Sequence, residues 1–190
     1  MSTTTPSILP FTGDAEADAL LVDEPLALLI GFVLDQQVTL QKAFGGPLEL
    51  KRRLGSLDAR RIASMDPEQL DETFRRRPAL HRFPGTMADR TRAMCAFVAE
   101  RYDGDAARVW TEASDGRDLE RRLLELPGIG PMKAKALIAI LGRRLGVRPS
   151  GWEEVAPGYP TLGDVDSPEA LTRYQEQKRA HKAELRAAAG

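Results

Sequence analysis

The chain has 190 residues, of which 42% are hydrophobic and 29% charged, and it contains one cysteine. This composition excludes a disordered chain, a collagen-like fibre and a disulfide-stabilised scaffold. The 27 basic and 28 acidic side chains give a net charge of −1, so bulk charge indicates neither nucleic-acid nor membrane binding. The charge is uneven, however: residues 51–150 carry 21 basic and 14 acidic side chains, and the segments on both sides are acidic.

No segment predicts membrane insertion or secretion. The longest apolar stretch, Leu26–Leu34, is shorter than a bilayer span, and the first residues lack the basic segment of a secretory signal. We therefore expect a cytoplasmic protein without a membrane partner. Cys95, His81 and His181 are too few ligands for a zinc site or an iron–sulfur cluster, so no iron–sulfur cofactor is expected.

Helical periodicity dominates the chain, and no stretch shows the sustained alternation of a strand. Start signals precede Pro25, Pro67 and Pro168, and glycines at Gly45-Gly46-Pro47, Gly104 and Gly146 predict helix ends. We expect an all-α fold of six to nine short helices, in one domain over residues 14–190 with a C-terminal helix at 167–189. Apolar residues recur at helical spacing in Ala19–Leu34, Ala59–Met65, Pro67–Phe74, Ala88–Tyr102, Leu119–Leu126, Met132–Leu145 and Pro168–Ala188.

Two segments do not read as helices. Residues 1–13 are rich in Ser, Thr and Pro, which predicts a flexible N-terminus that is either loose or draped over the body. Residues 148–163 contain prolines and glycines and predict a long ordered loop. Loops of this length are often functional, but Trp152 and Tyr159 could equally serve to pin this one to the core.

The most informative segment is the predicted hairpin at residues 124–134, LELPGIGPMKA. Gly128 and Gly130 allow positive φ and close approach of another molecule, and Pro131 favours the first turn of the next helix. Backbone N–H groups at the start of a helix donate hydrogen bonds to a phosphate whatever the base sequence, and Lys133 adds positive charge beside them. An ordinary turn between two helices is the alternative.

The segment LPGIGPMKAKALIAILG resembles the hairpin of the helix-hairpin-helix-GPD superfamily of DNA glycosylases. Two further segments resemble that family in order and spacing: LDQQVT at 34–39, and FPGTMADR at 83–90 followed by a helix and Asp103-Gly104-Asp105. The likeness covers residues 20–146. It implies a two-lobed helical bundle that binds double-stranded DNA and acts in base excision repair.

The resemblance also implies which residues contact DNA. Gln37 is the candidate wedge that fills the gap left by a flipped-out nucleotide, and Gln36 would hydrogen-bond in the pocket or minor groove. The alternative for both glutamines is an exposed helix end. The expected hairpin contacts are Gly128, Ile129, Gly130, Met132 and Lys133.

Several departures from the family change the expected chemistry. Met132 stands where bifunctional members carry a catalytic lysine, and Lys133 is turned by roughly 100° from that position. A monofunctional enzyme without lyase activity, using water as nucleophile, is therefore expected, with Lys133 as a lyase residue the alternative. The family's catalytic aspartate string is absent. The candidates are Asp164, Asp166 and Glu154, although Asp166 could merely cap the last helix and Asp164 could simply be solvated.

Other positions have more modest expectations. Met87 replaces a basic residue of the family, and Arg82 or Arg90 could take over its phosphate contact. His81 reads as a packed core residue, and the run 75–77 (RRR) as a solvated helix end or a DNA rim. In the family a monovalent cation binds hairpin carbonyls, which would here be those of Leu124, Leu126 and Ile129.

The sequence thus favours a monofunctional DNA glycosylase-like protein. Its alternatives are a non-catalytic helix-hairpin-helix DNA-binding module and, third, a partner-binding protein without DNA contact. The sequence identifies neither the base that would be removed nor an oligomeric state.

Overall fold

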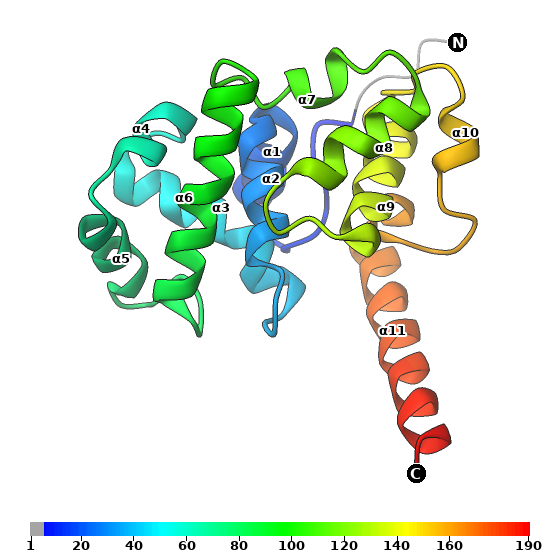
Figure 1. Ribbon diagram of the computed structural model, residues 1–190. Helices are drawn as coiled ribbons and strands as arrows, with labels where there is room; N and C mark the ends of the chain where they lie inside the picture. Colours follow the sequence, from blue (N-terminus) through cyan, green and yellow to red (C-terminus); the bar gives the residue numbers. More distant parts are fainter. Residues whose placement is uncertain (1–5) are drawn as a thin grey trace.

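The computed structural model describes residues 6–190 and is all-α, as expected (Figure 1). That range contains eleven α-helices, one π-helical turn and one short 3₁₀ helix, and no strand. The expected number of six to nine helices is therefore too low. The stretch expected at Ala19–Leu34 is two helices that meet at Glu24, and two helices of only four residues were not expected. The helices pack in two groups, which we call the N-terminal group (α1–α6) and the C-terminal group (α7–α11). None of the described helices is both long and apolar enough to cross a lipid bilayer.

The N-terminal group is built around α2, whose residues from Leu26 onward are all buried. Residues 9–11 also lie against this core: Leu9 and Phe11 are fully buried, and the Phe11 ring meets Phe44 edge-on. The described part of the N-terminal segment is therefore draped rather than loose, and residues 1–5 lie outside the described range. The group comprises α1 (Ala15–Asp23), α2 (Pro25–Leu34), α3 (Leu40–Leu54), α4 (Ala59–Ser64), α5 (Pro67–Arg75) and α6 (Pro84–Arg101).

The expected helix end at Gly45-Gly46-Pro47 is wrong, because α3 continues through it to Leu54. Gly46 and Pro47 are buried, and a Cβ atom on Gly46 would lie 2.4 Å from the Leu34 side chain. The missing side chain lets α3 approach α2 closely. Burial of this face thus outweighs the cost of glycine and proline within a helix. Gly104 and Gly146 do follow helix ends, at φ of +82° and +72°.

The C-terminal group carries the hairpin and the long loop. The stretch predicted as one helix over 132–145 is α9 followed by a π-helical turn. Gly163 of η2 packs against Ala139 of α9, where a Cβ atom would approach within 2.5 Å. The group comprises α7 (Arg108–Thr111), α8 (Gly116–Glu125), α9 (Pro131–Ala139), η1 (Ile140–Arg144), α10 (Trp152–Val155), η2 (Leu162–Asp164) and α11 (Pro168–Ala188).

The long loop is ordered by one of its two aromatic residues. Trp152 is buried, donates from Nε1 to the Ile138 carbonyl at 3.0 Å, and lies so close to Gly142 that a Cβ atom there would be 2.1 Å away. Tyr159 is 55% exposed, so it does not pin the loop to the core. A short helix, α10, forms within the segment predicted as loop because Trp152 anchors it.

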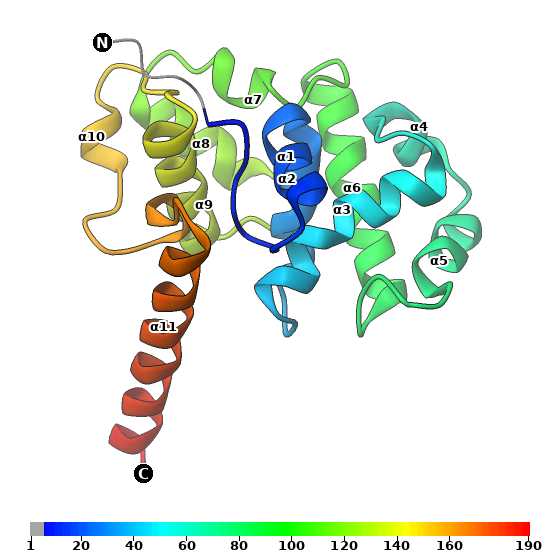
Figure 2. The same ribbon diagram turned by 180° about the vertical axis from the view of Figure 1, so that it is seen from behind.

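The two groups are joined by polar contacts as well as by chain connections. Gln41 of α3 and Gln175 of α11 exchange amide hydrogen bonds of 3.1 and 3.4 Å. Beyond this contact α11 projects away from the body, as both views show (Figures 1 and 2). The loop after α2 and the loop before α6 lie on the side of the molecule toward which α11 points.

Candidate nucleic-acid interface

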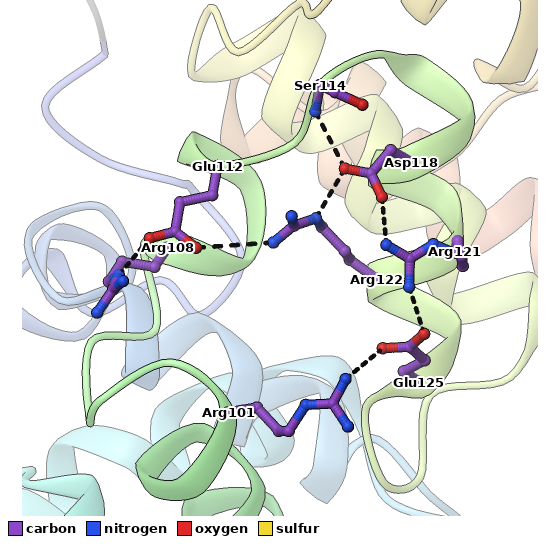
Figure 3. A network of polar contacts seen from close by, with 8 residues as sticks. All are labelled: Arg101, Arg108, Glu112, Ser114, Asp118, Arg121, Arg122 and Glu125. Atoms are coloured by element: carbon purple, nitrogen blue, oxygen red, sulfur yellow. Dashed lines mark hydrogen bonds and ion pairs between the residues drawn. The ribbon is translucent and has the colours of Figure 1, made fainter.

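A network of charged side chains holds α8, the helix that leads into the hairpin (Figure 3). Asp118 accepts from the Ser114 N–H at 3.0 Å and from Arg122 Nε at 2.9 Å, and these bonds hold the pKa of its carboxyl well below the usual range. At the far end of α8, Glu125 pairs with Arg121 and lies 3.8 Å from Arg101 of α6. The network thus fixes the last turn of α8 relative to the N-terminal group.

The hairpin is a tight turn with open space on its outer side. The Ile129 N–H donates to the Leu126 carbonyl at 3.1 Å, and both side chains are buried. Gly128 has φ +80°, the left-handed conformation that glycine adopts without strain. A Cβ atom at Gly128 or at Gly130 would meet no other atom within 4 Å. Another molecule can therefore approach the backbone at both glycines.

The start of α9 is left without a side-chain cap. Gly130 is its N-cap, and Pro131 follows at the first helical position. The helices α1, α3, α4, α5, α8 and α11 are capped by an Asp, Ser or Thr side chain, whereas α2, α6, α7 and α10 are uncapped like α9. The amides of the first turn have no acceptor within their own helix. Together with the helix dipole, these amides form a site that favours an anion.

Met132 stands at the edge of a groove beside the hairpin. Its side chain is 82% exposed, and the groove has a volume of about 490 Å³. This size is within the range of small-molecule sites. The groove runs between the start of α9, the loop around Pro160 and α11, and its principal side chains are Met132, Ala136, Tyr159, Tyr174, Lys178 and His181.

Lys133 turns inward and joins the two groups. Its Nζ donates to the Phe32 carbonyl of α2 at 2.6 Å, and burial lowers the pKa of the ammonium. The amine is thus engaged with backbone at the end of α2 rather than directed into the groove beside Met132.

Asp35 is a site residue that sequence reasoning missed. It follows the buried run of α2 directly and is itself half-buried. Burial raises the pKa of its carboxyl, while the charges of Lys178 and Lys133 oppose that shift. A carboxylate directly after a nine-residue apolar run was the available signal, because such a run is buried to its end. The sequence did not show that Lys133 of α9 and Lys178 of α11 lie near this carboxylate.

The two glutamines after Asp35 have different environments. Gln36 is half-buried, and its Oε1 accepts from Arg90 of α6. Gln37 is exposed and has φ +55°, a left-handed conformation that side-chain-bearing residues rarely adopt. Strained backbone of this kind concentrates at functional sites. Gln37 is therefore exposed on the loop, whereas Gln36 is held by its hydrogen bond with Arg90.

His81 is the packed residue expected from the sequence. It is buried, its Nε2 bonds the Leu34 carbonyl at 3.1 Å, and its Nδ1 accepts from the Phe83 N–H at 3.0 Å. Burial lowers the pKa of the imidazole, so the neutral form that these two bonds require is favoured. His81 thereby holds the loop before α6 against the end of α2. Arg82 is exposed on that loop, and residues 75–77 are exposed at the end of α5 and directly after it.

The three predicted carboxylates are not gathered at the hairpin. Asp164 is bound by Arg143 Nη1 at 2.8 and 2.9 Å, and its Oδ2 accepts from the Thr161 N–H at 2.8 Å. Glu154 pairs with Arg117 at 3.3 Å on the outer side of α10. Asp166 does not cap α11, because Ser167 accepts from the Ala170 N–H instead. Asp166 is exposed, and no ion pair involves it within residues 6–190.

The carbonyls expected to hold a cation lie where α8 ends. Leu124 is in its last turn, Leu126 is its C-cap, and Ile129 follows in the hairpin. Carbonyls at a helix C-terminus lack helical partners and carry the negative end of the dipole, so this donor set fits a monovalent cation.

No protein-family model matches the chain, and comparison with curated proteins and with solved structures gives no significant match.

Proposed function

We propose that the protein is a monofunctional DNA glycosylase-like protein of base excision repair, with the two-lobed arrangement of the helix-hairpin-helix type. The observation that carries the proposal is the hairpin. Two glycines with open space on their outer side lead into a helix whose first amides are uncapped. This arrangement accepts one phosphate of a DNA strand regardless of sequence.

The loop after α2 supplies the second part of the proposal. Gln37 is exposed in a left-handed conformation, as suits a side chain that enters the duplex where a nucleotide has left it. Gln36, oriented by Arg90, would hydrogen-bond at the minor-groove side. The groove beside Met132 would then receive the extruded base between aromatic and apolar side chains.

The chemistry is hydrolysis of the N-glycosidic bond. The bond between base and C1′ breaks with its electron pair leaving on the base, and a water oxygen bonds to C1′. A carboxylate stabilises the positive charge on the sugar and takes the proton of the water. We assign this role to Asp35, which is half-buried at the end of α2 directly before Gln36 and Gln37, with Asp166 as the exposed carboxylate of the predicted set. No lyase step is proposed, because Lys133 is engaged by Phe32 and Met132 has no amine.

A monovalent cation at the carbonyls of Leu124, Leu126 and Ile129 would complete the phosphate site. When bound, it would supply positive charge at the end of α8 beside the DNA strand. The chain's own contribution includes the orientation of the Leu126 carbonyl, which accepts from the Ile129 N–H.

A second candidate is a non-catalytic DNA-binding module that retains the hairpin. It is favoured by the engagement of Asp164 with Arg143 and of Glu154 with Arg117, which leaves neither carboxylate free. The two candidates share DNA binding and differ only in base release.

Duplexes that each carry one lesion test the proposal. The pure protein is incubated with a labelled panel, and strand breaks are measured with and without hot alkali. Breaks that require alkali support a monofunctional glycosylase and name its base, whereas breaks without alkali contradict the absence of a lyase step. Salt-sensitive binding without breaks favours the module. The Asp35→Asn and Asp166→Asn variants, assayed separately, identify the carboxylate.

A further inference from the structure

The distal half of α11 is exposed along its whole length, and Gln177, Lys178 and His181 form one wall of the groove beside Met132. Every residue from Glu176 to Gly190 is exposed, and both views show this part of the helix projecting beyond the body (Figures 1 and 2). Neither proline nor glycine interrupts the helix between Glu169 and Ala188.

Three cations form a stripe along this free segment. Arg179, Lys182 and Arg186 follow Gln175 by four, seven and eleven residues, so all four side chains share one helix face. Gln175 bonds Gln41 at the start of α3, which fixes that face toward the N-terminal group. Among the described residues none of the three cations has an acidic partner.

We propose that this stripe is a second DNA-binding element, which contacts the phosphates of one strand beside the hairpin; the inference rests on the proposed function. The three cations span about 10 Å of helix. Successive phosphates of one strand are about 3.4 Å apart along the duplex axis, so the stripe spans about three phosphate-to-phosphate steps.

The position of the stripe agrees with this partner. The loop that carries Gln37 and the loop before α6 with its exposed arginines lie on the side toward which α11 points. A duplex against these loops would be flanked by α11 on the face that bears the cations. The chain carries a net charge of −1, so this local concentration of positive charge is what complements a polyanion.

The salt dependence of DNA binding tests the stripe. Arg179→Gln, Lys182→Gln and Arg186→Gln are combined in one variant, since glutamine keeps the helix propensity. Each phosphate contact contributes about 0.9 to the slope of log K against log salt, so the slope should fall by about 2.7. The matched control is Arg173→Gln with Glu184→Gln, which changes the same helix on its other side at constant net charge and should leave the slope unchanged.

A chemical readout on the unaltered protein needs no variant. Acetylation of Lys182, followed by mass spectrometry, should slow several-fold when a duplex is bound. Lys51 serves as the reference, because it pairs with Glu24 at the opposite end of α2 from the Gln37 loop.

The outcomes separate the two proposals. An unchanged slope in the triple variant and unprotected Lys182, with binding still lost in a hairpin variant, overturn the role of α11 and leave the proposed function standing. If the wild-type protein binds no duplex, both proposals fall. An equal loss of slope in the triple variant and in its control means that DNA binding does not distinguish the two faces of α11, which also overturns the stripe.

Discussion

Replacement of Gly130 by valine tests the phosphate site at the start of α9 directly. Gly130 has φ −87° and ψ −177°, a conformation open to valine, and a Cβ atom there meets nothing within 4 Å. The free protein should therefore keep its stability. The valine side chain would instead occupy the space through which a phosphate reaches the amides of the first turn.

The magnitude follows from the contacts that the side chain would block. Hydrogen bonds to a charged group contribute about 1.5 kcal/mol or more each, so loss of two weakens binding by about 3 kcal/mol. This corresponds to a dissociation constant raised by about 100-fold. Because the substitution removes no cation from the interface, the slope of log K against log salt should stay nearly unchanged.

Fluorescence anisotropy with an undamaged labelled duplex, measured from 50 to 200 mM salt, gives both quantities. Gly130→Ala should have a smaller effect than Gly130→Val, and Gly45→Ala, at another glycine with open surroundings, should have none on binding. Unchanged affinity in Gly130→Val at unchanged thermal stability would refute the role of the hairpin.

Four further predictions address the neighbouring elements. Gln37→Gly should leave stability unchanged or raise it by about 1 kcal/mol, because it relieves the left-handed backbone, while 2-aminopurine fluorescence reports a loss of base flipping; an equal signal would contradict the wedge. Asp35→Asn should lower base release about 100-fold or more in the lesion assay. Because burial raises the pKa of Asp35, native stability falls as pH rises through that pKa, so the variant should be more stable than wild type at pH 7 and lose this advantage below the unfolded value of 3.8. Asp118 has a lowered pKa, so Asp118→Asn should lose about 2 kcal/mol at neutral pH in urea unfolding; the difference should begin to shrink as pH falls below the unfolded value of 3.8 and disappear only below the lowered pKa of the folded protein. Trp152→Ala should cost about 3 to 5 kcal/mol, since it empties the space against Gly142; a smaller loss would mean that the loop is anchored elsewhere.

The sequence by itself determined the helical class and several element boundaries. Period and capping residues are local properties, so Asp66 caps α5 as expected and the last helix spans Pro168–Ala188. The hairpin could be predicted for the same reason, because glycine and proline determine which φ angles their own residues adopt. The same local logic was wrong at Gly45-Gly46-Pro47, where packing of Gly46 against Leu34 keeps the helix intact.

Only the tertiary structure decided which charges meet. Asp35, Lys133 and Lys178 come from α2, α9 and α11, and no spacing in the chain relates them. The tertiary structure likewise pairs Asp164 with Arg143. It also shows that Ser167 caps α11. Side-chain pairing across elements depends on helix packing, which is set by burial of apolar faces over the whole chain rather than by neighbouring residues. For the same reason the direction of the basic stripe on α11 followed from one contact, between Gln41 and Gln175, that the sequence could not reveal.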